Sequence, residues 1–211
     1  MTFKRLASIS FLAGLLFALP CSPGHATFIA NLTGTTAEGA NTVFHYDLTF
    51  ITNLDSFGAP IERLDSTRNP NGDFLTIYNI QGLVGVTPPP DSPFAVTTQF
   101  TGINGFEQQA AFDDPTLLNV TFHFTSATPV SSDTVFRGAT IVSTHSGIGI
   151  GRYTFETTNN VNPGAGSPIS GTSFVSVPMA VPEPLSMALL GIGTLGALAL
   201  FRRGRGRCAR D

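Results

Sequence analysis

The sequence has 211 residues, of which 42% are hydrophobic and 12% charged, and its formal net charge is −3. The charge is unevenly spread, because residues 27–180 contain four arginines, no lysine and twelve acidic residues, a net charge of −8. An acidic segment without basic stripes is repelled by phosphate backbones and by anionic lipid. We therefore expect this segment to bind neither nucleic acid nor an anionic membrane surface.

The first feature in chain order is an export signal over residues 1–26. Lys4 and Arg5 precede the apolar run 6–19, and small residues, Gly24 and Ala26, stand at the −3 and −1 positions of a cleavage site. A basic start, a short apolar run and small residues before the cut are typical of a secretory signal peptide, with cleavage after Ala26. A retained membrane helix is the competing interpretation, but the run is short for a hydrocarbon core of ~30 Å.

The two cysteines, Cys21 and Cys208, lie outside residues 27–180. A lipoprotein signal at Cys21 is disfavoured because Pro20 stands where a small residue should precede the modified cysteine. The middle of the chain therefore has neither disulfides nor a thiol for catalysis or metal binding. It must be held together by packing, and about 150 residues is enough to bury a core.

The middle of the chain has the alternation of β-strands. In residues 41–52 the apolar side chains share one face and the polar ones share the other, and residues 117–125 repeat the pattern. The expected inward residues are Phe44, Tyr46, Leu48 and Phe50 in the first strand and Leu118, Val120, Phe122 and Phe124 in the second. The expected outward residues include His45, Asp47 and Thr49 in the first strand and Asn119, Thr121 and His123 in the second.

Further strand patterns alternate with turn-forming clusters, and Gly82 and Gly85 indicate a bend or bulge. The additional strand candidates are 73–86, 94–102, 133–145, 151–158 and 172–177. The turn clusters are 69–73, 88–91, 113–115 and 162–164. Because no long apolar pattern of period 3.6 occurs between residues 27 and 180, we predict an all-β fold over residues 27–177. The expected architecture is an antiparallel β-sandwich of about seven to nine strands, with a jelly-roll as the main variant.

Histidines and carboxylates offer two metal hypotheses. His45, Asp47 and His123 could hold zinc if their strands were adjacent, although polar residues on a solvated sheet face are the favoured interpretation. The turn 69–73 (NPNGD), with Asp113 and Asp114 added, could offer oxygen ligands to calcium. A plain turn is the better interpretation because the carboxylate alternation and the distant bidentate Glu are missing. The sequence therefore fixes no metal site, and it implies no cofactor.

Residues 146–152 (SGIGIGR) carry glycines at alternate positions after His145. Neither a nucleophile elbow nor a phosphate cradle is indicated, since both need a helix after the turn. We expect a glycine-bearing turn or edge strand, and we assign no catalytic residue. Two triplets starting at Asn31 and Asn119 fit the N-glycosylation pattern, which arises often by chance.

The pattern of the C-terminal region is typical of a membrane anchor. Residues 185–201 are seventeen residues without a charge, and a helix of that length spans about 26 Å. Basic residues beside a span stay cytoplasmic, so residues 202–211 form an expected cytoplasmic tail and the β domain lies on the other side of the inner membrane. The basic cluster consists of Arg202, Arg203, Arg205 and Arg207, followed by Arg210. A buried core helix is the competing interpretation, but it leaves these arginines unexplained.

The link between domain and anchor, residues 178–184, contains the sequence Val181-Pro182-Glu183-Pro184. Proline resists helix and ladder pairing, so this stretch should be extended and accessible. Pro-Glu-Pro, then a short apolar segment, then arginines resembles the PEP-CTERM sorting signal of Gram-negative bacteria. The resemblance implies recognition by exosortase, a membrane peptidase, and export to the cell surface or an exopolysaccharide matrix.

The expected function is therefore that of an exported surface or biofilm-matrix protein, transiently anchored in the inner membrane and without catalytic activity of its own. Two alternatives remain open at this point. The β domain could be a carbohydrate-binding module, although it lacks tryptophan, or it could be a secreted hydrolase.

Overall fold

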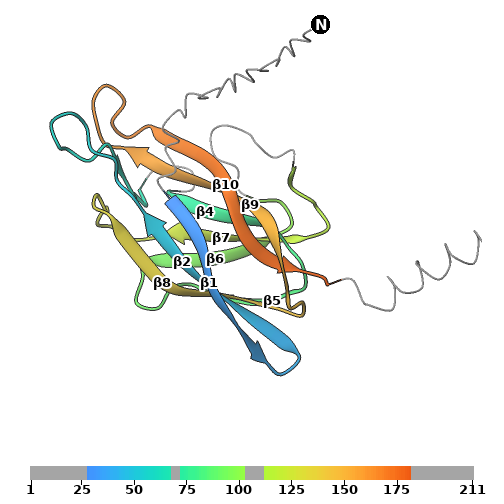
Figure 1. Ribbon diagram of the computed structural model, residues 1–211. Helices are drawn as coiled ribbons and strands as arrows, with labels where there is room; N and C mark the ends of the chain where they lie inside the picture. The colour runs from blue at the N-terminus through green and yellow to red at the C-terminus, as the bar shows by residue number, and fades with distance from the viewer. Residues whose placement is uncertain (1–27, 68–71, 103–111, 182–211) are drawn as a thin grey trace, which may run out of the picture.

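The computed structural model describes residues 28–67, 72–102 and 112–181 (Figure 1). In these residues the secondary structure is β-strand throughout, apart from turns and a single 3₁₀ position, and every strand pair is antiparallel. The predictions of an all-β fold and of antiparallel pairing are confirmed. The expected signal peptide (1–26), anchor (185–201) and tail (202–211) lie outside the described residues.

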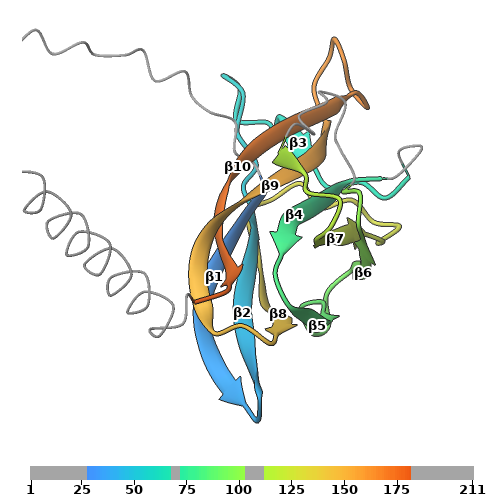
Figure 2. The same cartoon turned by 90° about the vertical axis from the view of Figure 1, so that its right-hand side faces the viewer.

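The strands form two sheets. The first sheet has the order β1 (Phe28–Glu38), β2 (Asn41–Phe50), β8 (Thr134–Ser143) and β5 (Leu83–Thr87). The second sheet has the order β10 (Pro168–Met179), β9 (Gly147–Asn159), β4 (Phe74–Ile80), β7 (Leu118–Phe124) and β6 (Phe94–Gln99), and β3 (Glu62–Arg63) also pairs with β9. In Figure 2, β2 and β8 lie on one side of β4, β7 and β6. The two layers share one apolar core, which is the arrangement of a β-sandwich.

The alternation expected for β2 is confirmed. Its apolar residues from Phe44 to Phe50 are fully buried, whereas His45 and Asp47 on the opposite face are half-exposed. Gly82 adopts a φ of 63° in the turn before β5, and the β5–β8 register shifts between Leu83 and Gly85. The expected bend and bulge are therefore both present. β1, which the sequence did not single out, pairs with β2 through a tight turn at Gly39.

Aromatic rings join the two sheets around Phe94 of β6. Its ring centroid lies 5.8 Å from that of Phe28 in β1, 4.9 Å from that of Phe136 in β8 and 5.7 Å from that of Phe124 in β7. Such ring pairs contribute about 0.5–1.5 kcal/mol each beyond their area burial. Residues 27–180 contain no cysteine, so this cluster links the two sheets by packing alone.

A hydrogen bond between side chain and backbone also crosses the core. Tyr46 of β2 is fully buried and its hydroxyl donates to the carbonyl of Ser176 in β10 at 2.8 Å. Burial raises the pKa of Tyr46, so the phenol stays protonated and remains a donor. This bond ties the edge strand of the second sheet to the first sheet.

One prediction for β7 is wrong. Asn119 and Thr121 were expected on a solvated face, but both are fully buried. The reason is that neighbouring chain folds over this face: Asn119 donates to the carboxylate of Asp113 at 2.8 Å and to the carbonyl of Phe100 at 3.3 Å. The Thr121 hydroxyl is paired with that of Thr76 at 2.9 Å. The outer face of the second sheet is thus covered at its centre by polar contacts rather than by water.

Candidate functional site

The point where the folded domain ends is well defined. β10 ends at Met179, and the backbone N–H of Ala180 donates to Oε1 of Gln81 at 2.8 Å, which holds the departing chain against the β4–β5 turn. Val181, the first residue of the expected sorting motif, follows at once and is 60% exposed. The rest of the motif, Pro182, Glu183 and Pro184, lies outside the described residues. Val181 therefore lies at the surface, more than half exposed, with one methyl beside Gly147 of β9.

The other parts of the expected sorting apparatus also fall beyond the described ranges. These are the signal cleavage position Ala26 and the basic cluster Arg202, Arg203, Arg205 and Arg207. Within residues 28–67, 72–102 and 112–181, no helix has the length and apolarity needed to span a bilayer.

The histidines of the zinc hypothesis are not brought together. His45 lies on β2 of the first sheet and His123 on β7 of the second. Each ring contacts a threonine of its own sheet: His45 Nε2 lies 3.0 Å from the hydroxyl of Thr36, and His123 Nε2 lies 3.0 Å from that of Thr97. Because the two histidines belong to opposite layers, the zinc hypothesis is wrong, and in the described parts of the chain no three potential metal ligands are grouped.

The calcium hypothesis fails for a similar reason. Asp73 directly precedes β4, whereas Asp114 contacts Asn79 near the other end of the same strand, through a 2.8 Å hydrogen bond from its backbone N–H. Asn79 is six residue steps along the chain from Asp73, about 20 Å in a strand. Asp113 also belongs to the distant end, where its carboxylate accepts from the backbone of Gly102 at 2.8 Å. The three aspartates therefore cannot share one ion.

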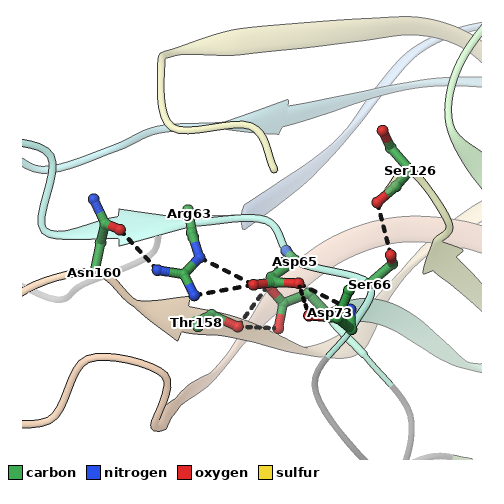
Figure 3. Close-up of polar contacts among 8 residues, drawn as sticks. Arg63, Asp65, Ser66, Asp73, Ser126, Thr158 and Asn160 are labelled. Carbon is green, nitrogen blue, oxygen red and sulfur yellow. Dashed lines mark hydrogen bonds and ion pairs between the residues drawn. The ribbon is translucent and has the colours of Figure 1, made fainter. Parts of the chain in front are cut away.

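Asp73 is instead a buried structural residue (Figure 3). Its carboxylate accepts the backbone N–H of Asp65 at 2.6 Å, and the hydroxyl of Thr158 in β9 lies 3.0 Å from both of its oxygens. The backbone N–H of Asp73 donates in return to the carbonyl of Asp65 at 2.9 Å. These bonds close the two ends of the 66–72 loop onto β9. The sequence predicted a turn here, but the turn motif places its aspartate inside the protein rather than toward a ligand.

Asp65 completes this network. Its Oδ1 accepts from the backbone N–H and the hydroxyl of Thr67, at 2.9 and 2.7 Å, and its Oδ2 forms an ion pair with Arg63 at 3.0 Å. Arg63 also donates to Oδ1 of Asn160 at 2.8 Å. Burial alone would raise the pKa of Asp65, but the bonds from Thr67 and Arg63 outweigh it and hold that pKa below its usual value. We refer to Arg63, Asp65, Asp73, Thr158 and Asn160 as the carboxylate network.

The carboxylate network has a structural role. Both oxygens of Asp65 and both oxygens of Asp73 already accept hydrogen bonds from the protein. A group whose oxygens are all engaged offers little to a cation or to a proton-transfer step. Sequence reasoning missed the network because its members come from three separate stretches of chain and lack a common motif.

Residues 147–152 form the start of β9, so of the two expectations, a turn or an edge strand, a strand is present, although β9 lies between β10 and β4 rather than at the sheet edge. Its alternate glycines face the core. A Cβ on Gly149 would lie 2.4 Å from Cε of Met179, and one on Gly151 would lie 2.7 Å from a methyl of Val177. The glycines thus let β10 pack its side chains directly over the β9 backbone, and they serve packing rather than phosphate binding.

The opposite face of the same ribbon is apolar and exposed. Ile148 and Ile150 of β9 are 56% and 78% exposed, and Phe174 of β10 is 63% exposed. The guanidinium of Arg152 lies over the ring of Phe174, 5.3 Å from its centroid, and 4.9 Å from the centroid of Phe112. We call Ile148, Ile150 and Phe174 the apolar strip.

The two glycosylation triplets differ in accessibility. Asn31 is exposed on β1, whereas Asn119 is fully buried with its amide donating to Asp113. In the folded domain only the first of the two could accept a glycan.

Comparisons with known proteins assign no family. No protein-family profile matches the chain, and no curated protein matches it. One solved structure is similar at low level, the crystal structure of ACE19, the collagen binding subdomain of the Enterococcus faecalis surface protein ACE. The alignment covers 72% of this chain and 97% of that chain, with 12% sequence identity and a TM-score of 0.28. A similarity of this size carries no argument about fold or function.

Proposed function

We propose that this chain is an exported surface or matrix protein that exosortase processes at Val181-Pro182-Glu183-Pro184. Residues 185–201 hold it in the inner membrane until cleavage, with the basic cluster after them on the cytoplasmic side. The β-sandwich acts after release, at the cell surface or in an exopolysaccharide matrix. It has no catalytic activity of its own in this proposal.

The observation that carries the proposal is the position of the motif relative to the fold. The sandwich is complete at Met179, and Val181 is exposed immediately before Pro182-Glu183-Pro184. Gln81 fixes the backbone of Ala180 to the body, so the motif begins at a defined point on the surface. A peptidase needs an accessible, extended substrate, and prolines favour that conformation. Cleavage within residues 181–184 would leave every strand of the sandwich intact.

The proposal is tested by substituting both prolines of the motif. Pro182→Ala with Pro184→Ala should abolish release, so that the chain accumulates in the membrane fraction at precursor size. The matched control is Pro129→Ala, which changes an exposed proline between β7 and β8 and should be released like the wild type. Immunoblots of membrane, surface and medium fractions from the native host give the readout. Normal release of the double variant would contradict exosortase processing at this motif.

A further inference from the structure

The apolar strip occupies the outer face of the β9–β10 ribbon. Ile150 is paired with Ser176 and Ile148 with Pro178, while Arg152 is paired with Phe174. The inner face of the same ribbon buries Val175 and Val177 in the core, so the exposure of the strip does not result from poor packing. Exposed aliphatic and aromatic side chains in a row indicate a surface that meets an apolar partner.

The charge on this face differs from that of the whole domain. The outward residues of β9 from 148 to 152 and their partners in β10 contain one charged side chain, Arg152; they are Ile148, Ile150, Arg152, Phe174, Ser176 and Pro178. The next acidic side chain on this face, Glu156, lies four positions further along β9 and is buried. Residues 27–180 have a net charge of −8, yet the outer face of the ribbon around the apolar strip carries one basic side chain, Arg152. A basic group beside apolar side chains is the combination that suits the headgroup and acyl boundary of a bilayer.

The strip also lies beside the chain exit. Ile148 and Ile150 are paired with residues one and three positions before Met179, which places them within about 10 Å of it along the strand. Only residues 182–184 separate Val181 from the apolar segment 185–201, and three residues extend at most about 11 Å. A bilayer holding residues 185–201 is therefore within reach of this face.

We propose that the apolar strip rests on the lipid bilayer while the chain is anchored. This inference rests on the proposed function, because it requires residues 185–201 to be in the membrane. The contact orients the sandwich so that Val181 and the sorting motif are held at the membrane surface. A second copy of the chain is the less favoured occupant, since three side chains are far fewer than the ~20–30 residues per partner that a stable interface uses.

The test places a polarity-sensitive fluorophore on the strip. The chain from Thr27 to Asp211, which is the form expected after signal cleavage and before anchor cleavage, carries Cys208→Ser, is labelled at Ile150→Cys and is reconstituted in phosphatidylcholine vesicles containing nitroxide-labelled lipid. The matched control is Phe57→Cys, an apolar side chain that is 93% exposed in the β2–β3 loop. That loop packs beside the opposite end of β9, because Ile61 accepts the N–H of Asn160. We expect blue-shifted emission and quenching by the lipid at position 150 and neither at position 57.

The outcomes separate the two proposals. If the chain does not float with the vesicles, the anchor itself fails, and this inference fails with it. If the chain floats but the probe at position 150 stays unquenched and fully hydrated, the bilayer contact alone is overturned. A probe that is shielded from water without lipid quenching would indicate a second copy and would also overturn it. In the Ile150→Cys background, Ile148→Asp should reduce quenching at position 150 and leave the control unchanged.

Discussion

At the scale of single residues, the carboxylate network shows how buried charge is accommodated in this domain. Asp65 and Asp73 are both nearly inaccessible to solvent, and each is compensated by donors from β3, β9 or the adjoining loop. Removing one partner from such a group leaves the others unpaired, which costs more than the bond itself contributes. The network therefore fixes Asp65 and Asp73 to the end of β9, an inner strand of the second sheet.

The depressed pKa of Asp65 predicts a pH-dependent contribution to stability. Because that pKa lies below the unfolded value of ~3.9, the ionised carboxylate stabilises the fold fully above about pH 4 and loses this effect as the pH falls through the native pKa. Asp65→Asn should cost about 1.5–3 kcal/mol near neutral pH, the range for hydrogen bonds to charged groups. Thermal unfolding between pH 2 and 7 should show the difference between wild type and variant shrinking at the acid end.

Asp91→Asn is the control for the loss of one carboxylate, since Asp91 is exposed in the turn before β6 and asparagine tolerates its positive φ of 55°. A stability difference for Asp65→Asn that is the same at every pH would contradict the role assigned to its ionised form.

At the scale of elements, the β9–β10 ribbon has two faces with different tasks. Alternate glycines on the inner face bring the β9 backbone close to Val177 and Met179, whereas the outer face carries the apolar strip. Successive side chains of a strand point to opposite faces. The repeated dipeptide Gly-Ile therefore places its glycines against β10 on the inner face and its isoleucines in solvent on the outer face.

Gly151→Ala should destabilise the sandwich by about 1–3 kcal/mol, the usual cost of overpacking. Its new Cβ would lie 2.7 and 2.8 Å from the two methyls of Val177, a buried β-branched side chain with little freedom to move away. Gly85→Ala is the matched control, since nothing lies within 4 Å of its Cβ position, and it should change the stability by less than about 1 kcal/mol. Urea unfolding measures both. Equal stability of the two variants would contradict this explanation of the glycines.

The sequence predicted the positions of the strands better than it predicted which segments pack on them or pair with them. The period of two in β2 located Phe44 to Phe50 in the core, because one face of that strand is buried and the other is not. The same reasoning failed at Asn119, whose side chain is buried and bonded to Phe100 and Asp113, which lie outside the strand. Pairings such as β2 with β8 and β4 with β9 join strands that lie far apart in the sequence, with several other strands between them, and no local pattern encodes them.

At the scale of the whole molecule, the end of the sandwich at Met179 lies directly before the C-terminal sequence motif. The order of motif, apolar segment and arginines comes from the sequence, whereas the point at which the sandwich ends and the apolar strip beside it come from the fold. In the part of the chain that the structure describes, every residue of the apolar core precedes Met179. Under the proposed function, cleavage within residues 181–184 would remove none of these core residues.

The most direct test of this central claim is the intact mass of the mature protein isolated from its native host. We predict a chain that begins at Thr27 and ends within residues 181–184, with the mass of residues 185–211 missing and any attached group added. In a strain without exosortase, the mass should include Asp211. A mature protein that retains Asp211 in cells with active exosortase would contradict the account.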